Sequence, residues 1–202
     1  MAQFGFGTSL PPVVKNLIIA NVVVFLAQFV LEQQGYSLIP LFALQPLGSG
    51  DFRVWQLVTH MFMHGGFMHI LFNMFGLWMF GSLLENYWGP KRFFQFYMIC
   101  GLIAGLAHLV FSNGSAIGAS GAIMGIFAGF AYLFPETPLY LFFVPIPIKA
   151  KWAMPGLILV DVFSAISPRL DDNVAHWAHI GGALAGLALV LIWNKTNRKT
   201  FY

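Results

Sequence analysis

The amino-acid sequence predicts an all-α membrane protein, a polytopic bundle of six transmembrane helices with a half-submerged loop between helices 1 and 2. Three observations predict this class. Of the 202 residues, 58% are hydrophobic and only 8% are charged, whereas soluble domains carry about 25% charged residues. Six apolar runs are long enough to cross a bilayer, which takes about 20 residues each. The basic residues gather on alternate connections between these runs, as positive-inside sorting requires.

The six runs account for most of the chain, so we expect one membrane domain over residues 1–202. The first run begins after Lys15 and is too long for a secretory signal, and no cleavage site follows it. We therefore interpret it as a retained helix. The predicted spans are 15–32, 66–85, 92–111, 117–134, 150–167 and 174–193.

The basic residues predict the orientation of these spans. With the N-terminus inside, eight basic residues fall on one side of the membrane and two on the other. We therefore expect a multi-pass protein of the cell inner (plasma) membrane with both termini cytoplasmic. The formal charge of +3 then reflects orientation, and no nucleic-acid partner is expected. The eight are Lys15, Lys91, Arg92, Lys149, Lys151, Lys195, Arg198 and Lys199, and the two are Arg53 and Arg169.

The connection between the first two spans, roughly residues 33–65, is long and contains apolar patches such as "LIPLFALQ". Long loops with their own structure are usually functional or interfacial, and Trp55 suits a membrane–water boundary. We expect a partly helical, half-submerged hairpin. The chain has a single cysteine, Cys100, so it has no disulfide framework.

Four polar side chains from three spans are predicted to share one layer in the outer half of the membrane. Polar groups inside spans are expensive, so they are candidates for function. Ser120 and His179 lie at similar depths in the fourth and sixth spans. His69 and Asn73 are four residues apart in the second span and share one helix face.

Small residues predict which spans touch. Two stripes with four-residue spacing begin beside the serine and the histidine of this layer, and such stripes let helix backbones approach closely. We therefore expect the fourth and sixth spans to pair and to bring Ser120 to His179. The stripes are Gly121, Gly125 and Gly129 in the fourth span, and Ala178, Gly182 and Gly186 in the sixth.

These residue types suit nucleophilic acyl transfer. A serine hydroxyl needs an adjacent base, and a neutral imidazole can take its proton and return it to the leaving amine. The side chains of His69 and Asn73, with the backbone N–H of Ser120, are suited to stabilise the oxyanion. Asp161 in the fifth span is interpreted as a structural or helix-end group, which leaves a Ser–His dyad as the simpler proposal.

The motifs resemble those of the rhomboid intramembrane serine proteases, in the bacterial six-transmembrane form. The G-x-S-G motif matches residues 118–121, A-H-x-x-G matches 178–182, and H-x-x-x-N matches His69 and Asn73. A further G-x-x-x-E-x-x-x-G pattern matches Gly81, Glu85 and Gly89. The resemblance covers essentially the whole chain from Lys15 to Trp193.

By this resemblance, Ser120 is the nucleophile and His179 is the general base, with His69 and Asn73 assisting the oxyanion. Glu85 would be structural. The resemblance implies an intramembrane serine endopeptidase that cleaves transmembrane segments of other membrane proteins near the outer face, with no cofactor and no metal. Preferred substrates would be single-span proteins with small, helix-destabilising residues. One departure is Gln56, because the family often has arginine after the tryptophan.

Two alternative functions stay open. In the first alternative, the chain is a catalytically inactive rhomboid-like binding protein. An intact Ser120 and His179 argue against this alternative. In the second it is a haem or metal membrane protein, since several histidines supply imidazole ligands. Those histidines are His60, His64, His69, His176 and His179. We interpret His60, His64, His108 and His176 as interfacial or packing residues.

Overall fold

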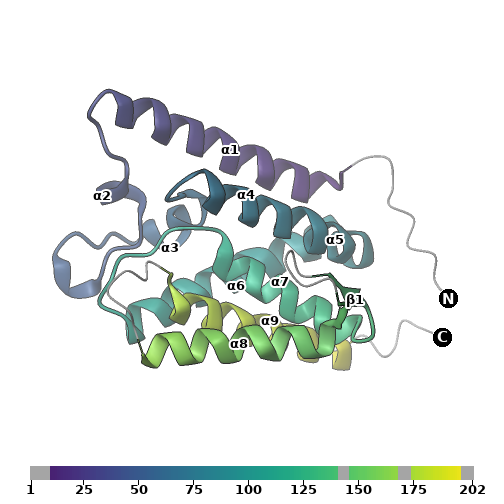
Figure 1. The fold of residues 1–202 in the computed structure, drawn as a ribbon. Coiled ribbons are helices and arrows are strands. Elements are labelled where there is room, and N and C mark those ends of the chain that lie inside the picture. The colour runs from purple at the N-terminus through teal and green to yellow at the C-terminus, as the bar shows by residue number, and fades with distance from the viewer. Residues whose placement is uncertain (1–9, 141–145, 168–173, 197–202) are drawn as a thin grey trace.

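The computed structural model of the chain describes residues 10–140, 146–167 and 174–196. Three of the basic residues that predict the orientation, Arg169, Arg198 and Lys199, lie outside these ranges. Regular structure in the described ranges is almost all helical (Figure 1). A short antiparallel pair, β1 (Pro138–Leu139) with β2 (Ile148–Lys149), joins α7 to α8. The prediction of a mostly helical membrane protein is therefore confirmed.

The main helices follow the six predicted apolar runs. They are α1 (Pro12–Gln33), the continuous run of α4 (Phe67–Gly76), η3 (Leu77–Gly81) and α5 (Ser82–Trp88), then α6 (Pro90–Phe111), α7 (Ser120–Leu133), α8 (Ala150–Ile166) and α9 (His176–Thr196). Short helical turns occupy the first long connection: α2 (Ile39–Phe42), η1 (Leu47–Ser49), α3 (Gln56–Thr59) and η2 (His60–Phe62). This loop is therefore partly helical, as predicted. Its depth in the membrane stays a prediction.

Two helix boundaries differ from the predicted ones for identifiable backbone reasons. The second span continues to Trp88, beyond the predicted end at residue 85, and stops at Gly89, whose φ is 80°. Helix α7 begins at Ser120 rather than at residue 117, because Gly118 has a φ of 116° and breaks the helix before it. Glycine adopts positive φ without the steric cost that other residues meet. Ser120 is consequently the first residue of its helix.

The start of α1 is held by a buried carboxylate. Val13 N–H donates to Glu85 Oε1 at 2.9 Å, and Val14 N–H donates to Glu85 Oε2 at 2.8 Å. The first N–H groups of a helix have no acceptor within the helix, so an external acceptor is needed when they are buried. Glu85 thus joins α1 to α5, which is a structural role of the kind that the resemblance implied.

Helices α6, α7 and α9 pack together at the centre, while α1 and α8 lie on opposite outer sides (Figure 1). The buried face of α6 carries large side chains, among them Phe93, Phe96 and Tyr97. On α1, by contrast, Val23 and Phe29 are more than half exposed. Apolar side chains facing outward fit a lipid surround better than water.

Within the described residues, four helical segments are long and apolar enough to cross a membrane: Pro12–Gln33, Phe67–Trp88, Pro90–Phe111 and His176–Lys195. Helix α7 has only 14 residues and α8 has 17. At about 1.5 Å per residue, α7 is about 21 Å long, which is shorter than the hydrocarbon core of a bilayer. A count of six spanning helices therefore stays a prediction.

The loop between α1 and α4 is organised by Gln56, whose side chain is fully buried. Its Oε1 accepts from the backbone N–H of Gln45 at 3.2 Å and of Arg53 at 3.0 Å. Its Nε2 lies 3.2 Å from Asp51 O and 3.3 Å from Pro40 O. One amide therefore satisfies both sides of the loop, so glutamine holds this loop together at the position where the family often has arginine.

Candidate active site

Ser120 and His179 lie against each other at the end of the bundle where α7 and α9 both begin. Ser120 Oγ is 2.8 Å from His179 Nε2, a normal hydrogen-bond length. Ser120 is the first residue of α7, and His179 lies in the first turn of α9. The sequence predicted that these two side chains would meet, and the structure brings them together.

Glycines make this meeting of α7 and α9 geometrically feasible. A Cβ at Gly182 would overlap the carbonyl oxygen of Gly121, and a Cβ at Gly186 would overlap the backbone of Gly125. A Cβ at Gly125 would lie only 2.8 Å from the carbonyl oxygen of Gly182. Neither backbone has space for a methyl group at these positions. The predicted pairing of the fourth and sixth helices through small residues is therefore confirmed.

A third helix takes part in this contact, which the sequence analysis missed. A Cβ at Gly125 would lie 2.6 Å from Cys100 Sγ, and a Cβ at Gly121 would lie 2.5 Å from Ala104 Cβ, both on α6. The predicted stripe is also one residue too long, because Gly129 faces Phe96 rather than α9. The signal was present in α6, where Cys100 and Ala104 are small and lie four residues apart on one face.

The side chain of His69 lies against Gly118. A Cβ at Gly118 would lie 2.7 Å from His69 Nε2 and 3.7 Å from Ser120 Oγ. His69 Nδ1 accepts the backbone N–H of Gly65 at 3.2 Å, which assigns the ring proton to Nε2. His69 thus presents a donor beside the residue that precedes α7 by two positions. Gly118 provides both the backbone bend and the space for this ring.

Asn73 is buried one turn beyond His69 on α4. Its Nδ2 donates to the carbonyl oxygen of His69 at 2.8 Å, while its Oδ1 has no hydrogen-bond partner within the described residues. The side-chain donor is therefore engaged with its own helix in this structure. It would have to turn or be shared in order to reach a reacting group near Ser120.

Asp161 lies inside α8 and not at its end, and its Oδ1 is 3.1 Å from His179 Nδ1. The same oxygen is 2.6 Å from His176 Nδ1. The sequence analysis interpreted Asp161 as a structural or helix-end group and did not anticipate these contacts, because the rotation of α8 about its axis decides which side Asp161 faces. Sequence spacing within α8 does not determine that rotation.

Comparison with known proteins gives a family match over most of the chain. Residues 51–195 match the model of the Rhomboid domain, which covers most of the described helices and both members of the Ser120–His179 contact.

The chain belongs to the rhomboid family. It is similar to presenilin-associated rhomboid-like protein A, mitochondrial, of Danio rerio, with 30% identity over 90% of this chain and 49% of that protein. It is also similar to the rhomboid protease GlpG of Salmonella paratyphi A, with 28% identity over 93% of this chain and 65% of that protein. The GlpG of Salmonella typhi is 29% identical, again over 93% of this chain and 65% of the relative. The chain thus spans between about half and two thirds of the length of these relatives. Family membership and the apolar helices support a membrane location.

Three other histidines of this rhomboid chain, His60, His64 and His108, lie in or beside the loops around the site. His60 Nδ1 donates to Gln56 O at 2.7 Å, and His108 Nε2 is 2.9 Å from Gly114 O. Burial lowers the pKa of His60 to about 4, and burial likewise lowers the pKa of His64 to about 4. Both imidazoles are therefore neutral at neutral pH. Their burial agrees with the packing role expected for them.

The histidines offered as haem or metal ligands are not gathered into one set. Among the residues that the structure describes, the group that is close enough to share an ion consists of Asp161, His176 and His179. His60 contacts the loop carbonyl described above, while His64 packs edge-to-face on His69.

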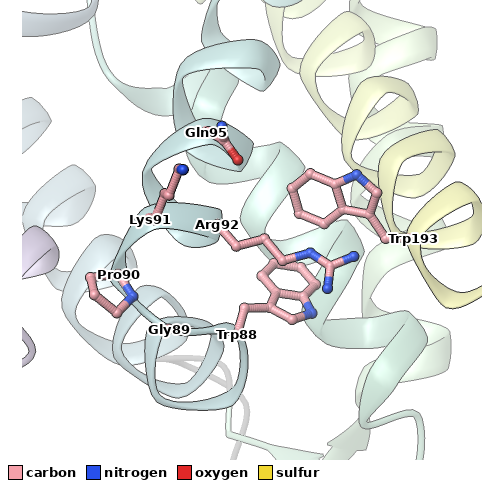
Figure 2. Close-up of a pocket in the computed structure, with 7 residues that line it drawn as sticks. All are labelled: Trp88, Gly89, Pro90, Lys91, Arg92, Gln95 and Trp193. Atoms are coloured by element: carbon pink, nitrogen blue, oxygen red, sulfur yellow. The ribbon is translucent and has the colours of Figure 1, made fainter. Parts of the chain in front are cut away.

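A basic hollow of the described rhomboid bundle lies at its other end. Figure 2 shows Lys91 and Arg92 at the start of α6, beside Trp88 and Trp193. The Arg92 guanidinium carbon is 4.4 Å from the centre of the Trp193 ring. The residues lining this cavity of 370 Å³ include no serine or histidine, so it offers no second Ser–His pair.

Proposed function

We propose that this rhomboid protein is an intramembrane serine endopeptidase in which Ser120 is the nucleophile and His179 the general base. The observation that carries the proposal is the distance of 2.8 Å between Ser120 Oγ and His179 Nε2. A neutral imidazole at that distance can accept the hydroxyl proton as the oxygen attacks a peptide carbonyl. A serine without such a base would be a poor nucleophile.

The reaction then proceeds by acyl transfer. Ser120 Oγ forms a bond to the scissile carbonyl carbon, and its proton moves to His179 Nε2. The carbon–nitrogen bond breaks, and the protonated imidazole returns the proton to the leaving amine. Water then attacks the acyl-enzyme, again with His179 as the base, and releases the second product.

The oxyanion of this reaction is proposed to form beside the N-terminus of α7. The N–H groups of the first helical turn have no acceptor within the helix, so Ser120 N–H is suited to donate there. His69 adds its Nε2–H from the Gly118 side. Asn73 is proposed as a further donor once its amide leaves the carbonyl oxygen of His69.

The proposed setting is a single membrane domain of the cell inner membrane, with both termini cytoplasmic and six spanning helices. In Figure 1 the start of α1 and the end of α9 lie at the same end of the bundle. The Ser120–His179 pair lies toward the opposite end, where α7 and α9 begin. Cleavage is therefore proposed near the outer face, on transmembrane segments of other proteins with small, helix-destabilising residues.

The test is cleavage of a single-span reporter protein in proteoliposomes by wild type and by Ser120→Ala. We expect cleavage by wild type and none by the variant. Ser82→Ala is the matched control, because Ser82 is also a serine within a helix, and it should cleave like wild type. Cleavage by Ser120→Ala would reject the serine mechanism. Failure of wild type to cleave the reporter or to react with a fluorophosphonate would favour the inactive, binding-only alternative.

A further inference from the structure

A carboxylate lies against the far side of the imidazole that faces Ser120. Asp161 Oδ1 is 3.1 Å from His179 Nδ1 and 2.6 Å from His176 Nδ1. The three side chains are mostly enclosed, with relative exposures of 10% for Asp161, 13% for His176 and 17% for His179. The two histidines are three residues apart on α9, so they share a helix face and can reach one carboxylate.

This arrangement fixes where the ring protons lie. An ionised carboxylate only accepts hydrogen bonds, so the Nδ1 atoms of His176 and His179 must both carry a hydrogen. A neutral imidazole has one N–H, so His179 Nε2 is then unprotonated. That nitrogen is the one 2.8 Å from Ser120 Oγ. Asp161 therefore selects the tautomer of His179 that can receive the serine proton.

We propose that Asp161 is a positioning residue for His179 and that His176 holds its carboxylate in place. The inference rests on the proposed function of Ser120 and His179. It extends the pair into a chain of three groups, in the order that soluble serine hydrolases use. When the serine proton moves to His179 Nε2, the imidazolium charge faces Asp161, and the carboxylate stays ionised throughout.

His176 has a separate physical task. A carboxylate in the apolar part of a helix bundle is expensive unless it is paired. The contact with His179 is the longer of the two, and the contact with His176 is the shorter, so His176 is the stronger holder of the carboxylate. This division leaves His179 free to rotate slightly during proton transfer without releasing Asp161.

A divalent cation is the competing explanation for the same three groups, since their ligand atoms lie within 4.8 Å of one another. The separations of 2.6 and 3.1 Å are ordinary hydrogen-bond lengths, and they need no ion between the atoms. A cation on His179 Nδ1 would also leave the ring proton on Nε2, where it would block the acceptance of the serine proton. The two explanations therefore predict opposite responses to metal removal.

The experiment compares Asp161→Asn with wild type on the single-span reporter, and it measures kcat and KM separately. We expect Asp161→Asn to lower kcat by about a hundredfold or more while KM changes by less than about threefold, because orientation and charge act on the transition state. Val160→Asn is the matched control, since it adds the same amide to the exposed face of α8. It should keep wild-type kcat.

Three further measurements test the proposed role of Asp161. His176→Gln should lower kcat by about tenfold, because the carboxylate then loses its stronger holder. The ¹⁵N spectrum of histidine-labelled wild type should show His179 as the Nδ1–H tautomer, which is measurable even where Asp161→Asn fails to fold. Addition of EDTA should leave wild-type cleavage unchanged.

The following results would contradict the proposed role of Asp161. A kcat within about threefold of wild type in Asp161→Asn, while Ser120→Ala is inactive, would remove Asp161 from the site and leave the proposed function intact. An Nε2–H tautomer for His179 would do the same. Loss of cleavage in EDTA that zinc restores would make the cluster a metal site. Inactive wild type would instead reject the proposed function, and this inference with it.

Discussion

Helix α9 has two very different neighbours at the proposed site. Against α7 its backbone is in direct contact, and glycines at positions 121, 125, 182 and 186 leave no space for a side chain. Against α8 the contact is made by side chains, chiefly Asp161 with His176 and His179. A cavity of 420 Å³ lies between α8 and the α7–α9 pair, lined by Ala128, Tyr132, Ile158 and Leu187 among others.

The α7–α9 contact and the α8–α9 contact have different tasks in the proposed site. Packed backbones cannot separate without losing many contacts at once, so the distance between nucleophile and base is held firmly. Helix α8 instead exposes large apolar side chains, with Leu159 69% and Phe163 66% exposed. Fewer contacts restrain α8 than α7 or α9, so α8 can shift more readily than either of them.

The largest effect should come from the reacting pair itself. Ser120→Ala and His179→Ala should each lower cleavage by several orders of magnitude, and the double variant should lose no more than the worse single variant. Groups that act as one unit show this non-additivity. Initial rates of reporter cleavage measure it. Additive losses would mean that the two residues act independently, and the 2.8 Å contact would then have no catalytic meaning.

The next effect should come from the backbone contact between α7 and α9. In Gly182→Ala the new methyl group would overlap the carbonyl oxygen of Gly121. Overpacking costs about 1–3 kcal/mol of stability, and a displacement of about 1 Å between reacting groups costs about a hundredfold in rate. Thermal unfolding and cleavage rates should both fall.

The matched control is Gly156→Ala in α8, because no atom lies within 4 Å of a Cβ there. It should keep wild-type activity, with a melting temperature equal to or slightly above that of wild type. Equal losses in Gly182→Ala and Gly156→Ala would show that the tight contact with α7 is no more demanding than the open surface of α8.

Asn73→Ala should have a moderate effect that falls on kcat. A donor aimed at an oxyanion is worth up to about a hundredfold, but Asn73 Nδ2 is engaged with the carbonyl oxygen of His69. We therefore expect about a tenfold lower kcat with KM little changed. Asn21→Ala is the matched control, since Asn21 Nδ2 makes the same bond to Leu17 O at 2.8 Å on α1. A change in KM alone for Asn73→Ala would assign this residue to substrate positioning.

The smallest effect should come from the apolar lining beside α8. Ile158→Ala enlarges a cavity that is already open at a partly buried position, so the loss of stability should be below about 1 kcal/mol, less than the about 2–5 kcal/mol of such truncations in a closed core. Reporter cleavage should stay within about threefold of wild type. A large loss of stability here would mean that α8 is packed as tightly as α7, which would remove the contrast between the two neighbours.

Much of this architecture was accessible from the sequence because it follows from local patterns. Apolar runs predicted the helices, and four-residue spacing of glycines predicted which two backbones meet. The meeting of Ser120 with His179 followed from their similar depth and from those glycines. Each of these inferences uses a periodicity or a length that the chain itself carries.

Other features depend on tertiary geometry that no local pattern encodes. The contact of Asp161 with α9 was not anticipated because it depends on the rotation of α8. The start of α7 at Ser120 depends on the positive φ of Gly118, which makes room for His69 as well. Gln56 appeared only as a departure from a family pattern, and its buried hydrogen bonds became visible once the loop was folded.

In the proposed mechanism His179 activates Ser120, and covalent labelling of the serine tests this activation directly. The chain in proteoliposomes is treated with a fluorophosphonate, and the modified residue and its rate of modification are determined by mass spectrometry. We predict that the adduct forms on Ser120 in wild type and that His179→Ala slows its formation by at least about a hundredfold. An adduct on another residue, or equally rapid labelling of Ser120 without His179, would contradict the account.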